Sequence, residues 1–186
     1  MIGSITAFLG SMKSGKSGLL YQQIDKARYR KSSICLVKPK IDTRDFTARI
    51  EVYGTNVDTY YCNELMEIYH TIIKYDIICI DEGQFIPDIG ICCDQLALRD
   101  KEIYISALNG TAEMEPWESI SKLLPYCDNI IRCSAVCEEC GKAHKATFSW
   151  YPEFKEKVVI GDVVYKVLCR DCWHKLNKEK YKDVVN

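Results

Sequence analysis

The chain has 186 residues, a length that suits one large domain with a small addition better than two full domains. Its formal net charge of −1 gives no reason to expect nucleic-acid or membrane binding, because phosphate neutralisation needs clustered Lys and Arg. No segment approaches the roughly 18 uninterrupted apolar residues of a membrane span and no basic leader begins the chain, so we expect a cytoplasmic protein with a small-molecule partner.

Up to about residue 135, short apolar runs alternate with longer amphipathic segments. The runs are rich in β-branched and aromatic residues and predict strands, whereas the amphipathic segments carry apolar residues at helical spacing. In chain order, the expected elements are a strand at Ile5–Leu9, a helix at Lys16–Arg30, strands at Ile34–Val37 and Val57–Tyr61, a helix at Leu65–Lys74, a strand at Ile77–Asp81, a helix at Ile89–Arg99 and a strand at Ile103–Ala107. This alternation predicts an α/β fold, an open parallel sheet with helices on both faces and its ligand at the carboxyl ends of the strands.

A glycine-rich loop lies between the first expected strand and the first expected helix. Its spacing, Gly-x-x-x-x-Gly-Lys-Ser, lets backbone N–H groups surround phosphates while Lys16 reaches their charge and Ser17 offers a hydroxyl to Mg²⁺. The positive end of the helix also points at the loop. An ordinary glycine turn is the alternative. We predict a P-loop NTPase-like domain whose phosphate site consists of Gly10, Ser11, Met12, Lys13, Ser14, Gly15, Lys16 and Ser17.

Two acids follow the apolar run that ends at Ile80. Asp81 would emerge beside the glycine loop and hold Mg²⁺ through its water shell. Glu82 points elsewhere and can accept a proton from an attacking hydroxyl, or from water in an ATPase. Solvated acids at a strand end are the alternative. The segment Asp42-Thr43-Arg44 either brings a guanidinium toward the phosphates or forms a solvated turn.

The chain contains eleven cysteines, an odd number that internal disulfides cannot fully pair. In a reducing compartment such thiols fill the core or bind metal. Those in apolar runs or in a helix-like stretch are expected to be core fillers: Cys35, Cys79, Cys92 and Cys93.

The character of the sequence changes after Ile131, and residues 136–186 are too few to bury a core of their own. We therefore expect residues 1–135 to form the phosphate-binding domain and residues 136–186 a small appended one. The appended segment contains two Cys-x-x-Cys pairs, which can form a closed, structural Zn²⁺ site. A redox-active pair and buried free thiols are the alternatives. The predicted Zn²⁺ ligands are Cys137, Cys140, Cys169 and Cys172.

The motifs together resemble those of the type II thymidine kinases, the zinc-containing group found in animal cells, bacteria and large DNA viruses. The resemblance covers most of the chain, from Gly10 to Cys172. It rests on GSMKSGKS at 10–17, KPKIDTR at 38–44, DEGQF at 81–85, ALNGT at 107–111, AVCEECG at 135–141 and YKVLCRDC at 165–172.

The resemblance implies an ATP-dependent kinase that phosphorylates deoxythymidine at its 5′-hydroxyl to give thymidine monophosphate, in nucleotide salvage. It implies that Glu82 is the base and that Lys16 and Arg44 assist catalysis. ATP would contact the glycine loop together with Asp42, Arg44, Asp81 and Gln84, and Ser17 and Asp81 would hold Mg²⁺. The family tends to form tetramers, which implies a homo-oligomer.

The resemblance also implies a nucleoside pocket closed by a lid loop from the zinc-ribbon-like domain. The corresponding residues are Met12, Phe85, Leu108, Thr147, Val158, Val159, Ile160 and Tyr165. From the residues alone, Met12, Phe85 and Tyr165 could line a pocket, but such residues are more often core positions. The sequence departs from the family at Ala112, where an aromatic residue is usual, and at Trp117, where the family has Phe. The rival function is a P-loop ATPase whose zinc ribbon binds DNA or a protein partner.

Overall fold

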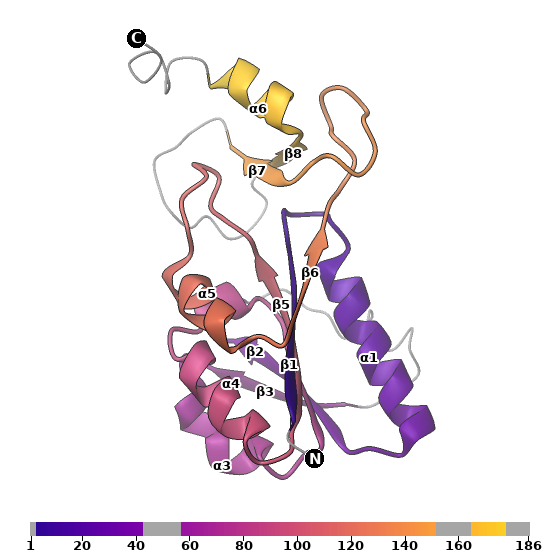
Figure 1. Ribbon diagram of the computed structural model, residues 1–186, viewed down its shortest axis with the longest axis vertical. Helices are drawn as coiled ribbons and strands as arrows, with labels where there is room; N and C mark the ends of the chain where they lie inside the picture. Colours follow the sequence, from indigo (N-terminus) through magenta and orange to yellow (C-terminus); the bar gives the residue numbers. More distant parts are fainter. Residues whose placement is uncertain (1–2, 43–56, 152–164, 178–186) are drawn as a thin grey trace.

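The computed structural model describes residues 3–42, 57–151 and 165–177. Its larger part is a six-stranded, all-parallel sheet with the strand order β3-β2-β4-β5-β1-β6, and a two-stranded antiparallel sheet, β7-β8, lies in a smaller C-terminal unit (Figure 1). The strands are β1 (Ser4–Gly10), β2 (Ile34–Pro39), β3 (Asp58–Cys62), β4 (Ile77–Ile80), β5 (Glu102–Leu108), β6 (Asn129–Cys133), β7 (Phe148–Trp150) and β8 (Lys166–Leu168).

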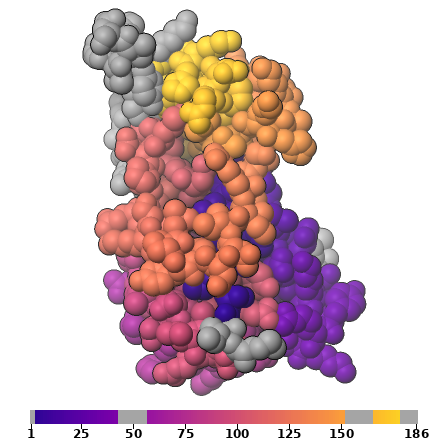
Figure 2. Space-filling view, in the orientation of Figure 1, coloured from indigo at the N-terminus to yellow at the C-terminus, as the bar shows by residue number. Residues whose placement is uncertain are grey.

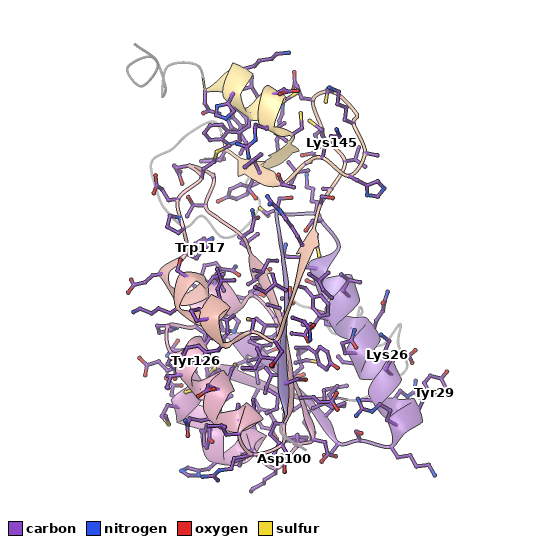
Figure 3. All side chains as sticks on the ribbon, viewed as in Figure 1. Lys26, Tyr29, Asp100, Trp117, Tyr126 and Lys145 are labelled. Atoms are coloured by element: carbon purple, nitrogen blue, oxygen red, sulfur yellow. The ribbon has the colours of Figure 1, made fainter. Side chains whose placement is uncertain are left out.

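Helices cover both faces of the large sheet, so the predicted α/β architecture is confirmed. Figure 1 shows α1 on one side and α3, α4 and α5 on the other. In Figure 3, Lys26 and Tyr29 accordingly project from the α1 side, and Trp117 and Tyr126 lie on the opposite side. The helices are α1 (Lys16–Arg30), α3 (Tyr69–Ile72), α4 (Ile89–Ala97), α5 (Glu118–Leu123) and α6 (Arg170–Leu176), with short 3₁₀ helices η1 (Leu65–Ile68), η2 (Gly83–Phe85) and η3 (Leu124–Tyr126).

One predicted helix is shorter and less regular than expected. The segment Leu65–Lys74 forms η1 and then only the single turn of α3. The carboxylate of Asp88 accepts the N–H groups of Leu65 and Met66 at 2.8 and 2.9 Å. A distant side chain therefore fixes the first turn, which explains why helical periodicity alone overestimated the element.

The core consists of two apolar clusters, one on each face of the sheet. Along β1, Ile5, Ala7 and Leu9 belong to the cluster under α4, whereas Phe8 belongs to the cluster under α1. This is the period-two alternation of a strand. The four thiols expected as core fillers, Cys35, Cys79, Cys92 and Cys93, are all fully buried.

The C-terminal unit has a small apolar cluster of its own, centred on Trp173. The chain enters it directly from β6, and Ala135 pairs with Ala146 in an isolated antiparallel bridge. In Figure 2 this unit, coloured orange to yellow, lies directly above indigo atoms of the N-terminal segment. Among the residues described, no helix has both the length and the apolar character to cross a membrane.

Candidate active site

The loop between β1 and α1 has the backbone shape that its glycines predict. Gly15, at the N-terminus of α1, has a φ of +82°, which glycine adopts without strain. A Cβ atom at Gly10 would lie 2.5 Å from the carbonyl oxygen of Cys133, so no larger residue fits there. Lys16 is buried and its Nζ donates to the carbonyl oxygen of Ser11 at 2.7 Å. The loop thus places the N-terminus of α1 and the ammonium group of Lys16 beside the glycines, a suitable arrangement for phosphate.

The end of β4 brings a carboxylate to this loop. Strand β5 separates β4 from β1, yet Ser17 Oγ donates to Asp81 Oδ1 at 3.2 Å. The hydroxyl of Tyr21 donates to the other oxygen of Asp81 at 3.4 Å. A hydroxyl and a carboxylate oxygen are hard donors that Mg²⁺ prefers.

The ionisation of Asp81 depends on what surrounds it. Burial raises the pKa of this carboxyl above its ordinary value, and the neighbouring charge of Glu82 raises it further. The Ser106 hydroxyl and the Lys38 ammonium oppose that shift. A cation bound beside Asp81 would favour the charged carboxylate, so these residues fit the Mg²⁺ site predicted from the sequence.

Glu82 follows in a left-handed conformation, with a φ of 52°. This turn separates its carboxylate from that of Asp81 and directs it toward Gln84, whose Nε2 donates to Glu82 Oε2 at 2.7 Å. Gln84 is itself held, because its Oε1 accepts the N–H of Leu108 at 3.0 Å and its carbonyl accepts from Ser119 at 2.7 Å. A buried amide therefore fixes the orientation of Glu82.

Asp42 lies in the core rather than in a solvated turn. Its Oδ2 is 3.1 Å from Lys38 Nζ, and the two side chains are 2 % and 1 % exposed. Lys38 in turn lies close enough to Asp81 to influence its charge. Arg44, which the resemblance places near the phosphates, lies outside the described residues.

Several residues expected around the nucleoside lie close to the phosphate loop. Met12 packs against the C-terminal cluster, and its N–H donates to Ser149 Oγ at 3.2 Å. The ring of Phe85 meets that of Trp117 edge-on, with centroids 5.5 Å apart. The aromatic side chain beside Ala112 is that of Trp173, whose indole N–H donates to the carbonyl of Ala112 at 3.2 Å.

Two further expected residues, Thr147 and Tyr165, approach through their backbone. The carbonyl of Thr147 accepts the side-chain amide of Asn109 at 3.2 Å, and the N–H of Asn109 donates to Gly10 at 3.3 Å. The carbonyl of Tyr165 accepts from Lys13 Nζ at 3.3 Å. The remaining expected lid residues, Val158, Val159 and Ile160, lie outside the described part of the chain.

The four cysteines of the two Cys-x-x-Cys pairs converge. Their sulfurs all lie within 4.8 Å of one another, and Cys140 Sγ is 3.8 Å from Cys169 Sγ. A tetrahedral Zn²⁺ site with Zn–S bonds of about 2.3 Å has sulfurs about 3.8 Å apart. The cluster therefore fits a structural metal such as zinc.

The four clustered thiols can all be ionised at the same time only when a cation lies between them. Burial by itself raises the pKa of Cys137, but the N–H groups of Cys169, Cys140 and Glu139 lower that pKa to about 6. For Cys172, burial and the hydrogen bonds among the thiols raise the pKa to about 12. Four thiolates this close repel one another, and a divalent cation between them removes that repulsion.

Sequence reasoning missed several residues that hold this site together. Lys38 carried a signal, since it stands four residues before Asp42 in the KPKID segment. Asn109 and Glu138 lie inside quoted motifs, but nothing in those motifs indicated their partners. Ser149 and Tyr21 carried no recognisable pattern, because their contacts cross 137 and 60 residues of chain respectively.

Comparison with known proteins agrees with this geometry. The family profile described as "Thymidine kinase" matches residues 3–173. A cytosolic thymidine kinase from Gallus gallus is 31 % identical over 172 residues, covering 92 % of this chain and 77 % of that protein. The thymidine kinase of raccoon poxvirus is 29 % identical over 171 residues, covering 92 % and 97 %.

Among solved structures, the flagellar accessory protein FlaH from Methanocaldococcus jannaschii superposes with a TM-score of 0.55 at 14 % identity, covering 70 % of each chain. At that identity the likeness concerns the fold alone. The family match over nearly the whole chain, together with the phosphate loop, the paired acids and the four clustered thiols, confirms the resemblance: this chain belongs to the thymidine kinase family of phosphotransferases.

Proposed function

We propose that this protein transfers the γ-phosphoryl group of ATP to the 5′-hydroxyl of deoxythymidine and serves nucleotide salvage. The observation that carries the proposal is the contact between Ser17 and Asp81, which joins the phosphate loop to the acids after β4. The relatives named thymidine kinase, one viral and one avian, support the choice of deoxythymidine as the nucleoside.

The phosphates of ATP would lie in the loop from Gly10 to Ser17, where backbone N–H groups and Lys16 balance their charge. Ser17 and Asp81 would hold Mg²⁺, which supplies charge neutralisation at the phosphates when it is bound. Arg44 is proposed to assist from the segment after Asp42. Because phosphoryl transfer demands little covalent work of the protein, positioning and charge account for most of the catalysis.

Glu82 is proposed as the base that accepts the proton of the 5′-hydroxyl. Its Oε2 accepts a hydrogen bond from the side-chain amide of Gln84 at 2.7 Å, which fixes the orientation of the carboxylate. The thymine ring would lie among Met12, Phe85 and Leu108, and the segment from Thr147 to Tyr165 would close over it.

We propose that the four clustered cysteines bind structural Zn²⁺ and so support the closing segment. None of the eleven cysteines forms a disulfide, which fits a reducing, cytoplasmic compartment. A homo-oligomer, tetrameric by resemblance, and the absence of a nucleic-acid partner remain predictions.

The test is phosphoryl transfer by purified protein supplied with ATP, Mg²⁺ and labelled thymidine. Thymidine monophosphate should form, and Glu82→Gln should lower kcat by roughly 100-fold or more while ATP binding persists. Thymidine should stimulate ATP consumption, whereas single-stranded DNA should not. Failure to form the monophosphate, or full activity of Glu82→Gln, would contradict the proposal.

A further inference from the structure

The phosphate loop is held from outside by the C-terminal unit at three consecutive residues. Ser11 Oγ donates to the carbonyl of Ala146 at 3.0 Å, and the Met12 N–H donates to Ser149. Lys13 Nζ donates to Glu138 Oε1 at 2.7 Å. Three consecutive residues of the loop therefore contact the unit that contains the cysteine cluster.

Glu138 occupies a special place in that unit, because it lies between two of the clustered thiols, Cys137 and Cys140. Its Oε2 accepts the N–H of Val167 at 2.7 Å, and its own N–H donates to the carbonyl of Val167 at 3.0 Å. Val167 lies in β8, two residues before Cys169. Glu138 thus joins the two halves of the cysteine cluster with one oxygen and the phosphate loop with the other.

The side chain of Lys13 is directed at the C-terminal unit. Its Nζ donates to Glu138 and to the carbonyl of Tyr165, and its backbone has a left-handed φ of 56°. That conformation is uncommon for a residue with a long side chain and persists where neighbouring contacts hold it. The two acceptors supply such contacts.

We propose that Glu138 is a positioning residue that couples the metal occupancy of the cysteine cluster to the affinity of the phosphate loop for nucleotide. This inference rests on the proposed function, since it assumes nucleotide in the loop and metal among the thiols. A loaded cluster fixes Glu138 against β8, Glu138 fixes Lys13, and Lys13 holds the loop in its phosphate-binding shape. Each ligand therefore strengthens binding of the other, because coupling between two sites is reciprocal.

The size of the coupling is modest, because the pair is partly exposed. The Lys13 and Glu138 side chains are 54 % and 37 % exposed, and such ion pairs change an equilibrium by about two- to fivefold. The chain provides a matched control in the next residue. Glu139 pairs with Lys166 at 3.5 Å with similar exposure but, among the described residues, makes no contact with the phosphate loop.

The experiment measures binding rather than turnover. The zinc-loaded protein is titrated with ADP and Mg²⁺ by calorimetry, and its zinc affinity is measured by chelator competition with and without ADP. In the wild type, ADP should raise zinc affinity about two- to fivefold. Glu138→Gln should weaken ADP binding by a similar factor and abolish that rise, whereas Glu139→Gln should change neither.

A second variant tests the pair from the other side. Lys13→Met should also abolish the effect of ADP on zinc affinity, and combining it with Glu138→Gln should produce no further loss. This variant lies outside the cysteine unit, so the test stands even if Glu138→Gln destabilises that unit. The inference is wrong if ADP still raises zinc affinity in either variant, or if Glu139→Gln behaves like Glu138→Gln. If the protein phosphorylates thymidine but its nucleotide and zinc affinities are independent, the proposed function stands and only this inference is wrong.

Discussion

The buried ion pair between Lys38 and Asp42 predicts an unusually large loss of stability from one isosteric substitution. Asp42→Asn removes the carboxylate 3.1 Å from an ammonium group whose side chain is 1 % exposed. Removing one partner of a buried pair costs about 3–5 kcal/mol, because the remaining charge stays desolvated.

The expected shift in melting temperature follows from the length of the chain. With about 2.1 cal/mol/K per residue, 186 residues unfold with an entropy of about 0.4 kcal/mol/K. A loss of 3–5 kcal/mol then lowers Tm by roughly 8–13 °C. Lys38→Met combined with Asp42→Asn should recover part of the loss, since both charges of the pair are then absent, but Asp81 also loses the ammonium group near it.

Calorimetry or circular dichroism on heating provides the measurement, and a nearby exposed pair provides the control. Lys40 Nζ lies 2.9 Å from Glu67 Oε2, but these side chains are 51 % and 39 % exposed. Glu67→Gln should therefore lower Tm by no more than about 3 °C. Equal effects of Asp42→Asn and Glu67→Gln would refute the reasoning that burial determines the cost.

Two further substitutions test other features of the structure. The indole N–H of Trp117 is buried and has no hydrogen-bond acceptor among the described residues, so Trp117→Phe should keep the edge contact with Phe85 and change the free energy of unfolding by less than about 1 kcal/mol. Trp117→Ala should cost about 2–4 kcal/mol in urea unfolding, and a Phe variant as unstable as the Ala variant would indicate that the N–H is satisfied. Hydrogen bonds from Arg30 lower the pKa of Glu102, so the folded state binds the carboxyl proton of Glu102 more weakly than the unfolded chain does. The resulting stabilisation of the fold is complete above the pKa of Glu102 in the unfolded chain. It is lost as the pH falls through the lower pKa of the folded state. The urea midpoints of the wild type and Arg30→Met should therefore converge between about pH 6 and pH 3, and a constant difference would exclude this linkage.

Most of the six-stranded sheet and its helices could be predicted from the sequence because their signals are local. The apolar run before Asp81 and the glycine loop both carry their chemistry within a few consecutive residues, and the structure has β4 and the helix α1 where those patterns indicate. Elements whose signals are weak were not anticipated. The first four residues of the edge strand β6 are exposed, so this strand has no buried apolar run, and the three-residue strands β7 and β8 are too brief for periodicity to reveal.

The contacts that shape the candidate site could not be predicted from local sequence patterns for a different reason. The orientation of Glu82 depends on Gln84, but Gln84 is fixed by Leu108 and Ser119 from distant elements. The pairing of Lys13 with Glu138 likewise joins residues 125 positions apart. Such contacts follow from the complete topology, and a single sequence without that topology cannot specify them.

The hydrogen bond between Met12 and Ser149 also bears on how the protein is made. The two residues are 137 positions apart, so at about 5–20 residues per second a ribosome adds Ser149 roughly 7–27 s after Met12. Throughout that interval the nascent chain already contains its glycine loop but not the segment that completes it. Nucleotide capture is therefore expected to begin only after Ser149 has been synthesised and has reached the glycine loop.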